Sequence, residues 1–301
     1  MDLMDLSVKI GKLEMKNPVT VASGTFGYGL EYSELIDIER LGAITVKGIK
    51  KDPCPGNPLP RFCEVTGGMI NAIGLQGPGV EGFVKDDMPF LRSKNVPVIV
   101  NMWGTSVEGY AETAALLDKV EGIDALELNV SCPNVKKGGS SFSANPDLMA
   151  EVVQAVREQT SLTLITKLAP NVPDITIYAK KAVDAGADAL SVCNTVPAMA
   201  IDIEARKHVI ANKTGGLSGA AIHHIAVKLV WEVTHAVDVP VIGMGGIMEP
   251  KDAIELMAAG ATAVAVGTAN FIDPTTPIRV IDGIADYMQR HGMETPREIA
   301  I

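Results

Sequence analysis

Eight short runs of apolar and β-branched residues are spread along this 301-residue chain, and they limit the folds it can adopt. The runs cover residues 19–22, 43–46, 98–101, 125–129, 163–167, 189–193, 241–244 and 263–266. They are continuous rather than alternating, which is typical of parallel strands that are buried on both faces. Such a sheet has to be covered by helices.

Stretches with the spacing of amphipathic helices lie between these runs, at residues 108–120, 146–159, 175–185, 221–236 and 250–259. Strands alternating with helices predict an α/β protein with a (β/α)8 TIM barrel, formed by residues 1–301 as a single domain. We expect an N-terminal β-hairpin over residues 7–16 to close the bottom of the barrel. Long βα loops are expected at the C-terminal face, over residues 48–78 and 195–219. An open doubly wound sheet is the alternative, but no G-x-G-x-x-G follows the first strand.

Composition excludes several functional classes. A formal net charge of −10 argues against a broad nucleic-acid or membrane-binding face. The 4 cysteines contain no C-x-x-C pair, which argues against a metal site in this chain and favours a reducing compartment. No apolar run reaches the roughly 18 residues that span a bilayer. We therefore expect a cytoplasmic protein that binds neither nucleic acid nor membrane.

The fourth run ends in the sequence Asn129-Val130-Ser131-Cys132-Pro133-Asn134. This turn places a thiol, which can move a proton, between two amides that can hold a planar ligand. The chain has no H-E-x-x-H or paired-carboxylate motif. Surface or capping roles are expected for all five histidines, His208, His223, His224, His235 and His291. Acid–base chemistry is therefore assigned to Cys132.

The other predicted strand ends carry lysines, asparagines and glycines, and no aspartate or glutamate. Lys47 and Lys167 end apolar runs, so we expect both to serve the mouth of the barrel rather than its surface. The glycines after the seventh and eighth runs, at 245–246 and 267, indicate a phosphate site. Residues alone leave the cofactor unnamed, but a lysine facing the N1/C2 carbonyl edge of a flavin would stabilise its anionic reduced form, so FMN fits. A phosphate-binding scaffold or sensor is the non-catalytic alternative.

The chain resembles the dihydroorotate dehydrogenase family over essentially its whole length. The matching phrases are Thr45-Val46-Lys47-Gly48, Asn71-Ala72-Ile73-Gly74-Leu75-Gln76-Gly77-Pro78-Gly79, Asn129 to Asn134, Asn194-Thr195, residues 215–219, Gly245-Gly246-Ile247 and Val266-Gly267-Thr268. Cys132 resembles the base of the soluble class 1 enzymes. Lys136-Lys137-Gly138-Gly139 and Lys167-Leu168-Ala169-Pro170-Asn171-Val172 resemble the NAD-linked type B catalytic subunit.

The resemblance implies oxidation of (S)-dihydroorotate to orotate in pyrimidine (UMP) biosynthesis. Cys132 would take the C5 proton while the C6 hydride passes to flavin N5. The implied FMN-binding residues are Ser23, Lys47, Gly48, Asn101, Asn129, Lys167, Cys193, Gly219, Gly245, Gly246, Gly267 and Thr268. The implied substrate-binding residues are Lys47, Asn71, Ala72, Ile73, Gly74, Leu75, Asn129, Asn134, Asn194 and Thr195. Cys193 departs from the family pattern, in which an aliphatic residue is common.

The resemblance further implies a partner subunit that carries FAD and a [2Fe-2S] cluster and passes electrons to NAD⁺. Two catalytic and two electron-transfer chains would form a heterotetramer. Two alternatives stay open: an FMN barrel acting on another dihydropyrimidine, and a fumarate-linked dihydroorotate dehydrogenase.

Overall fold

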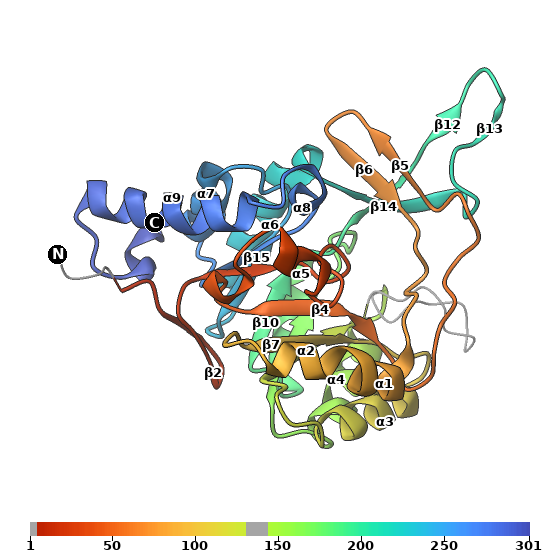
Figure 1. Ribbon diagram of the computed structural model, residues 1–301, viewed down its shortest axis with the longest axis horizontal. Helices are drawn as coiled ribbons and strands as arrows, with labels where there is room; N and C mark the ends of the chain where they lie inside the picture. Colours follow the sequence, from red (N-terminus) through yellow and green to blue (C-terminus); the bar gives the residue numbers. More distant parts are fainter. Residues whose placement is uncertain (1–4, 131–143) are drawn as a thin grey trace.

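An eight-stranded parallel sheet forms the centre of the molecule, as the computed structural model, which describes residues 5–130 and 144–301, shows in Figure 1. Its strands are β3 (Val19–Val21), β4 (Ile44–Ile49), β7 (Val98–Met102), β8 (Ala125–Asn129), β9 (Thr163–Lys167), β10 (Ala189–Val192), β15 (Val241–Met244) and β16 (Ala263–Val266). Their hydrogen-bonded order is β3-β16-β15-β10-β9-β8-β7-β4. Every predicted run is therefore confirmed as a strand.

The two ends of this order meet through buried threonines, which completes the barrel. The Thr20 hydroxyl on β3 donates to the Ala43 carbonyl at 2.9 Å and lies 3.1 Å from the Thr45 hydroxyl on β4. The backbone N–H of Gly42 donates to the Val19 carbonyl at 2.9 Å. The predicted (β/α)8 barrel is confirmed.

Helices surround the sheet, and the five predicted ones are confirmed. They are α3 (Val107–Leu117), α4 (Pro146–Arg157), α5 (Ile175–Asp184), α6 (His223–Thr234) and α7 (Pro250–Ala258). The start of α4 shows why the prediction succeeded. Asn145 caps it by accepting from the backbone N–H of Asp147 and Leu148, and Pro146 occupies the first turn, where a missing N–H is tolerated.

Several helical segments were not predicted. They are η1 (Glu31–Glu34), η2 (Ile38–Arg40), α1 (Gly79–Gly82), the π-helix η3 (Phe83–Asp87), α2 (Met88–Arg92), η5 (Ala220–Ile222), α8 (Ala269–Ile272), α9 (Thr276–His291) and η6 (Pro296–Ile299). The longest is α9, which buries Val280, Ile284 and Met288 at four-residue spacing and ends at Gly292 in the left-handed conformation, with φ 66°. Both signals are present in the sequence. None of the helices in residues 5–130 and 144–301 is long and apolar enough to cross a bilayer.

The bottom of the barrel is closed by the predicted hairpin, β1 (Val8–Ile10) and β2 (Leu13–Met15). Its residues Ile10 and Leu13 pack with Ile99, Ile165 and Ile242 in one buried cluster inside the barrel. The turn lies so close to β9 that a Cβ on Gly11 would come 2.9 Å from Thr163, and Gly11 also has a positive φ of 59°. A side chain at this turn would therefore be excluded on both counts.

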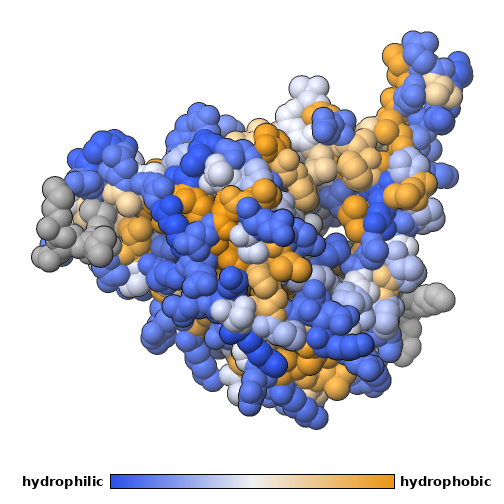
Figure 2. Space-filling view, viewed as in Figure 1, coloured by the Kyte–Doolittle hydropathy of each residue, from blue (hydrophilic) through white to orange (hydrophobic). Residues whose placement is uncertain are grey.

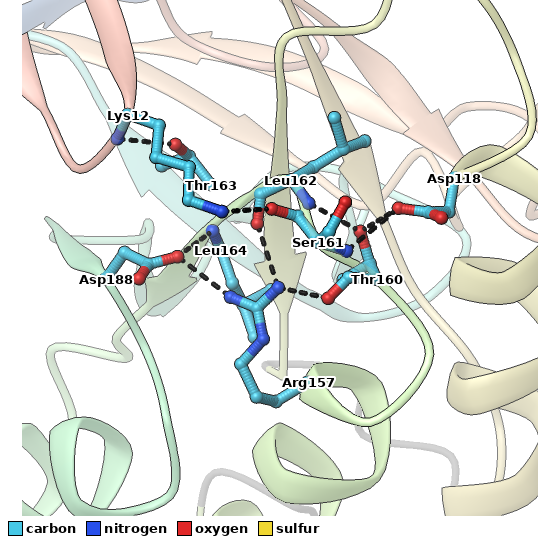
Figure 3. A network of polar contacts seen from close by, with 9 residues as sticks. All are labelled: Lys12, Asp118, Arg157, Thr160, Ser161, Leu162, Thr163, Leu164 and Asp188. Carbon is cyan, nitrogen blue, oxygen red and sulfur yellow. Dashed lines mark hydrogen bonds and ion pairs between the residues drawn. The ribbon is translucent and has the colours of Figure 1, made fainter.

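A polar network ties the hairpin to the bottom of β9 (Figure 3). The Lys12 backbone N–H donates to the Thr163 hydroxyl at 2.9 Å. The Arg157 guanidinium pairs with Asp188 at 2.8 Å and also donates to the Leu162 carbonyl at 3.0 Å and to the Thr160 carbonyl. These contacts fix the loop before β9.

The two predicted long loops pair with each other at the opposite end. The first forms β5 (Phe62–Val65) and β6 (Gly68–Asn71), and the second forms β11 (Val196–Met199) and β14 (Thr214–Ser218). Together they make an antiparallel sheet in the order β11-β14-β6-β5. The hairpin of β12 (Ile201–Asp202) and β13 (Lys207–His208) projects beyond it at the upper right of Figure 1. Figure 2 shows apolar side chains on the antiparallel sheet and its hairpin. The exposed ones include Leu59 and Phe62 in the first long loop and Ile201 and Ile203 in the second.

Candidate active site

The interior of the barrel changes from apolar to polar toward the carboxyl ends of the strands. The lower positions are filled by Ala125, Ile165 and Ala189. One inward position further along the same strands lie Glu127, Lys167 and Ser191, which are at most 5% exposed. The predicted mouth of the barrel therefore rests on a buried polar layer.

Glu127 is the centre of this layer and was missed by the sequence interpretation, which considered only strand ends. Its Oε1 accepts from the Asn101 amide at 2.6 Å and lies 3.5 Å from the Lys167 Nζ, while its Oε2 accepts from the Ser191 hydroxyl at 2.8 Å. An acid inside an apolar run is visible in the sequence. Its three side-chain partners lie on three other strands, and the sequence does not identify them.

Lys167 lies between this carboxylate and the top of β3. Its Nζ is 3.5 Å from Glu127 Oε1 and 3.4 Å from the Ser23 hydroxyl, and the side chain is 6% exposed. Lys167 is therefore buried inside the barrel and not on its surface, and its role at the mouth stays a prediction.

Lys47 is the last inward-facing residue of β4, and β4 lies next to β7 in the sheet. Burial lowers the pKa of the Lys47 ammonium, and the nearby positive charge of Arg61 lowers it further. Arg61 precedes β5 in the first long loop and was not predicted as part of the site. Two cations therefore lie close to one wall of the mouth, which favours an anionic ligand there.

Gly48 lies against the Asn101 side chain, and this close approach requires a glycine at position 48. A Cβ at Gly48 would lie 2.8 Å from the Asn101 Oδ1, so a side chain there would displace the amide. Asn101 is 1% exposed and fixed by its bond to Glu127. Both predicted residues thus belong to one local arrangement.

A second group of amides lies at the ends of β8 and β10. The Asn194 Nδ2 donates to the Asn129 Oδ1 at 3.5 Å, and the Asn194 Oδ1 accepts from the Thr195 backbone N–H at 2.8 Å. The Tyr110 hydroxyl on α3 donates to the Asn129 carbonyl at 2.8 Å. Three predicted substrate residues are therefore brought together.

The predicted segment 71–75 runs along the antiparallel sheet and the loop after β6. The Asn71 Nδ2 donates to the Gly216 carbonyl at 3.5 Å, and the Ala72 N–H donates to the Arg61 carbonyl at 2.7 Å. Gly74 and Leu75 have positive φ values of 77° and 52°. The Ile73 carbonyl accepts from the Asn57 N–H at 3.0 Å, so backbone groups as well as the Asn71 side chain hold this segment in place.

Glycines follow β15 and β16, as predicted. A Cβ on Gly246 would lie 2.7 Å from His223, so packing requires that glycine. At Gly267 the nearest atom to a Cβ would be 3.5 Å away, so the protein itself does not require a glycine there. Among the backbone hydrogen bonds that lie outside the helices and strands of the described residues, none uses the N–H groups of Gly246, Gly267 or Thr268 as donors. Donors of this kind suit a phosphate, and the residues present fit the phosphate end of FMN.

Three further predicted residues complete the surroundings. The Thr268 hydroxyl donates to the Ser218 hydroxyl at 2.8 Å, next to Gly219, whose φ is 99°. Cys193 is 4% exposed, and burial raises the pKa of its thiol to about 12, although Lys167 acts in the opposite direction. Cys193 therefore stays a neutral thiol.

One histidine prediction is wrong. His223, at the start of α6, is 5% exposed rather than on the surface. Its ring nitrogens lie 2.9 Å from the Gly245 carbonyl and 3.1 Å from the Glu255 carboxylate. These two partners draw the ring inward and brace the glycine turn after β15. The predicted base Cys132 and the predicted substrate residue Asn134 lie outside the described residues.

The (β/α)8 barrel, with buried amides and a buried lysine toward its carboxyl end, places the protein in the TIM-barrel class, whose active sites lie at that end. The family model for dihydroorotate dehydrogenase matches residues 5–288. The chain therefore belongs to the dihydroorotate dehydrogenase family.

Its relatives include proteins named dihydroorotate dehydrogenase B (NAD(+)), catalytic subunit. The relative from Geotalea uraniireducens is 51% identical over 295 residues, which cover 98% of this chain and 97% of the relative. Those from Bacteroides thetaiotaomicron and Bacteroides fragilis are 51% and 52% identical over 297 residues, covering 99% of this chain and 98% of each relative.

Proposed function

We propose that this chain is the FMN-dependent catalytic subunit of an NAD⁺-linked dihydroorotate dehydrogenase, which oxidises (S)-dihydroorotate to orotate in pyrimidine biosynthesis. The observation that supports the proposal is the carboxyl end of the barrel, where Lys167 is buried, Asn194 pairs with Asn129, and glycines follow β15 and β16. Relatives named for this activity, at about half identity over nearly the whole chain, support it.

FMN would be held by residues from all eight barrel strands and the loops that follow them, within a single domain over residues 1–301. The phosphate would accept hydrogen bonds from Gly245, Gly246, Gly267 and Thr268. The ring would lie against Ser23, Lys47, Gly48, Asn101, Asn129, Lys167, Cys193 and Gly219. Bound FMN supplies the acceptor for the hydride that leaves the substrate.

The residues of the chain itself would bind the pyrimidine and move one proton. The amides of Asn71, Asn129, Asn134 and Asn194 and the Thr195 hydroxyl would hydrogen-bond the ring, and Lys47 would pair with the carboxylate. The segment Ala72, Ile73, Gly74 and Leu75 would cover the ring. Cys132 would remove the C5 proton as the general base.

A partner subunit is part of the proposal. The relatives are named catalytic subunits, which supports a second chain in the assembly. We assign FAD and a [2Fe-2S] cluster to that chain, in a cytoplasmic heterotetramer of two catalytic and two electron-transfer chains. Electrons would leave FMN through the cluster and FAD to NAD⁺.

Turnover assays with purified protein test this function. The chain should release FMN on denaturation and oxidise dihydroorotate in preference to dihydrouracil. Reduction of NAD⁺ should require the partner, whereas artificial dyes should be reduced without it. Preference for dihydrouracil would move the activity to another dihydropyrimidine. Fast fumarate reduction by the chain alone would assign it to the fumarate-linked type, and recovery of FAD alone from this chain would reject FMN.

A further inference from the structure

A single buried acid lies beneath the proposed flavin site. In the described part of the chain, Glu127 is the buried carboxylate, and the buried nitrogen bases are Lys167 and His223. Glu127 is 2% exposed. Removing a carboxylate from water costs several kcal/mol unless partners compensate, so its surroundings have to supply positive charge and donors.

The carboxylate is held entirely by side chains on strands. Asn101 lies directly opposite Glu127 in the β7–β8 register, and Ser191 lies opposite Lys167 in the β9–β10 register. Asn101 donates to one carboxylate oxygen at 2.6 Å, and Ser191 donates to the other at 2.8 Å. Groups on strands hold a position more precisely than groups on loops, so this carboxylate is a fixed point.

Lys167 is the charged partner, and its contacts are long. Its Nζ lies 3.5 Å from Glu127 Oε1 and 3.4 Å from the Ser23 hydroxyl. An ammonium has three N–H donors, so these two contacts leave it able to donate to a further group. Glu127 is opposite Ile165 in the β8–β9 register, whereas Lys167 is opposite Asn129. The anion is therefore on the bottom side of the ammonium, and the open side faces the mouth.

We infer that Glu127 is a positioning residue, which holds the Lys167 ammonium in the interior of the barrel and offsets its charge so that its remaining donors are directed at the flavin ring. The inference rests on the proposed function, because it takes FMN to be the ligand above Lys167. It adds an acid to a site whose recognised members are bases, amides and glycines. The pair keeps the interior close to neutral while a cation faces the ring.

The first experiment measures the ion pair in the apoprotein, without any flavin. Glu127→Gln removes the charge but keeps an acceptor for Asn101 and a donor for Ser191. Free energies of unfolding are measured for Glu127→Gln, Lys167→Met and the double variant. Each single variant should be less stable than the double variant, since each leaves one buried charge without its partner.

The control cycle replaces Glu127 by an exposed acid. Glu151 lies on the outer face of α4 and is exposed. Glu151→Gln combined with Lys167→Met should give additive losses. Additive losses in the Glu127 and Lys167 cycle as well would overturn the inferred pair.

The second experiment separates positioning from packing, by measuring the midpoint potential of FMN bound to the holoprotein. Glu127→Gln should shift the potential upward, because the uncompensated ammonium stabilises the anionic reduced flavin more strongly. Lys167→Met should shift it downward. Ser191→Ala, which removes a hydrogen bond to the same carboxylate without changing charge, should leave the potential where it is.

An unchanged potential in Glu127→Gln would overturn the inference and leave the carboxylate a packing role. If that variant does not fold, Glu127→Asp keeps the charge but withdraws it from Lys167 by one methylene, and a smaller upward shift is expected. An unchanged midpoint potential in Glu127→Asp would likewise overturn the inference. Absence of FMN from the wild-type protein would instead reject the proposed function, and the apoprotein cycle would still report on the pair.

Discussion

The two ends of the barrel differ in how closely their charged side chains are paired. At the bottom, the Arg157 guanidinium donates to the Asp188 carboxylate at 2.8 Å and to the Leu162 carbonyl at 3.0 Å, so its contacts are short. At the mouth, the Lys167 ammonium has contacts of only 3.4 and 3.5 Å. The same strands thus carry a satisfied end, which stabilises the fold, and an end whose donors are available for chemistry.

The two ends of the barrel also differ in the polarity of the side chains that fill its interior. The bottom is closed by apolar side chains of the hairpin, including Ile10 and Leu13, packed on Ile165 and Ile242. One inward layer higher, Glu127, Lys167 and Ser191 replace them. We therefore expect substitutions at the bottom to change stability without changing chemistry. Substitutions at the mouth should change chemistry, and they should lower stability as well only where they break the buried pair of Glu127 and Lys167.

The largest effect is expected for Cys132→Ser, which replaces the proposed general base. A serine hydroxyl is a much weaker base than a thiolate, so flavin reduction by dihydroorotate should slow by about 10²–10⁴-fold at pH 7. Partial recovery is expected at high pH, with an unchanged free energy of unfolding. Anaerobic stopped-flow measures the rate. An unchanged rate at pH 7 would exclude Cys132 as the base.

At the bottom, Arg157→Ala should lower the free energy of unfolding by about 2–3 kcal/mol, because it removes charged hydrogen bonds and leaves Asp188 without its partner. Dihydroorotate turnover of the folded variant should match the wild type. Arg290→Ala, which breaks an exposed pair with Asp286, is the control and should cost less than about 1 kcal/mol. A large loss of turnover in Arg157→Ala would contradict the division between the two ends.

The two lysines, Lys47 and Lys167, are expected to differ in their effect on orotate binding. Lys47 is proposed to contact both flavin and substrate, and Lys167 mainly the flavin. Lys47→Ala should therefore weaken orotate binding by about 1.5 kcal/mol, roughly tenfold, and Lys167→Ala by clearly less. Orotate titration of the flavin spectrum gives both dissociation constants. Equal changes, with FMN retained in both variants, would refute the difference.

The smallest effect is expected at Asp87, outside both ends. Burial and the negative charges of Asp86 and Glu31 raise the pKa of the Asp87 carboxyl to about 6 from 3.8. The folded state therefore binds this proton more tightly than the unfolded state, so stability falls as pH rises from about 4 to about 6. Asp87→Asn should remove this loss.

Asp87 is only partly buried, so solvent screening limits the gain of Asp87→Asn at pH 7 to less than about 1 kcal/mol. Urea unfolding at pH 4 and pH 7 measures the difference, which should disappear at the lower pH. Glu151→Gln is the matched control and should show no such dependence. A variant that is less stable at pH 7 would show that the carboxylate is stabilising.

The barrel could be predicted from local sequence patterns. The features that depend on pairing between distant segments could not. The strands and the hairpin follow from continuous apolar runs and a Gly11 turn, which neighbouring residues determine. The long loops were placed at the correct end, but their pairing into a sheet joins segments about 150 residues apart and has no local signal. Missing α9 was avoidable, since Val280, Ile284 and Met288 have helical spacing.

The site was predictable to a similar extent. Lys167, Asn101 and Asn129 lie in the interior because each ends a buried run, which the sequence displays. Glu127 was overlooked because its role depends on Asn101 and Ser191, which are close to it only in the folded barrel. His223 was misplaced for the same reason, since Glu255 and the Gly245 carbonyl are on other elements.

The antiparallel sheet beside the mouth has a consequence for how this wall moves. Because β6 and β14 share a ladder from Gly216↔Asn71 to Ser218↔Met69, one loop cannot swing outward without breaking hydrogen bonds to the other. The two insertions therefore form one cooperative unit, whose amides should exchange with solvent together. We therefore expect a mutation that weakens this ladder in either loop to speed amide exchange in both.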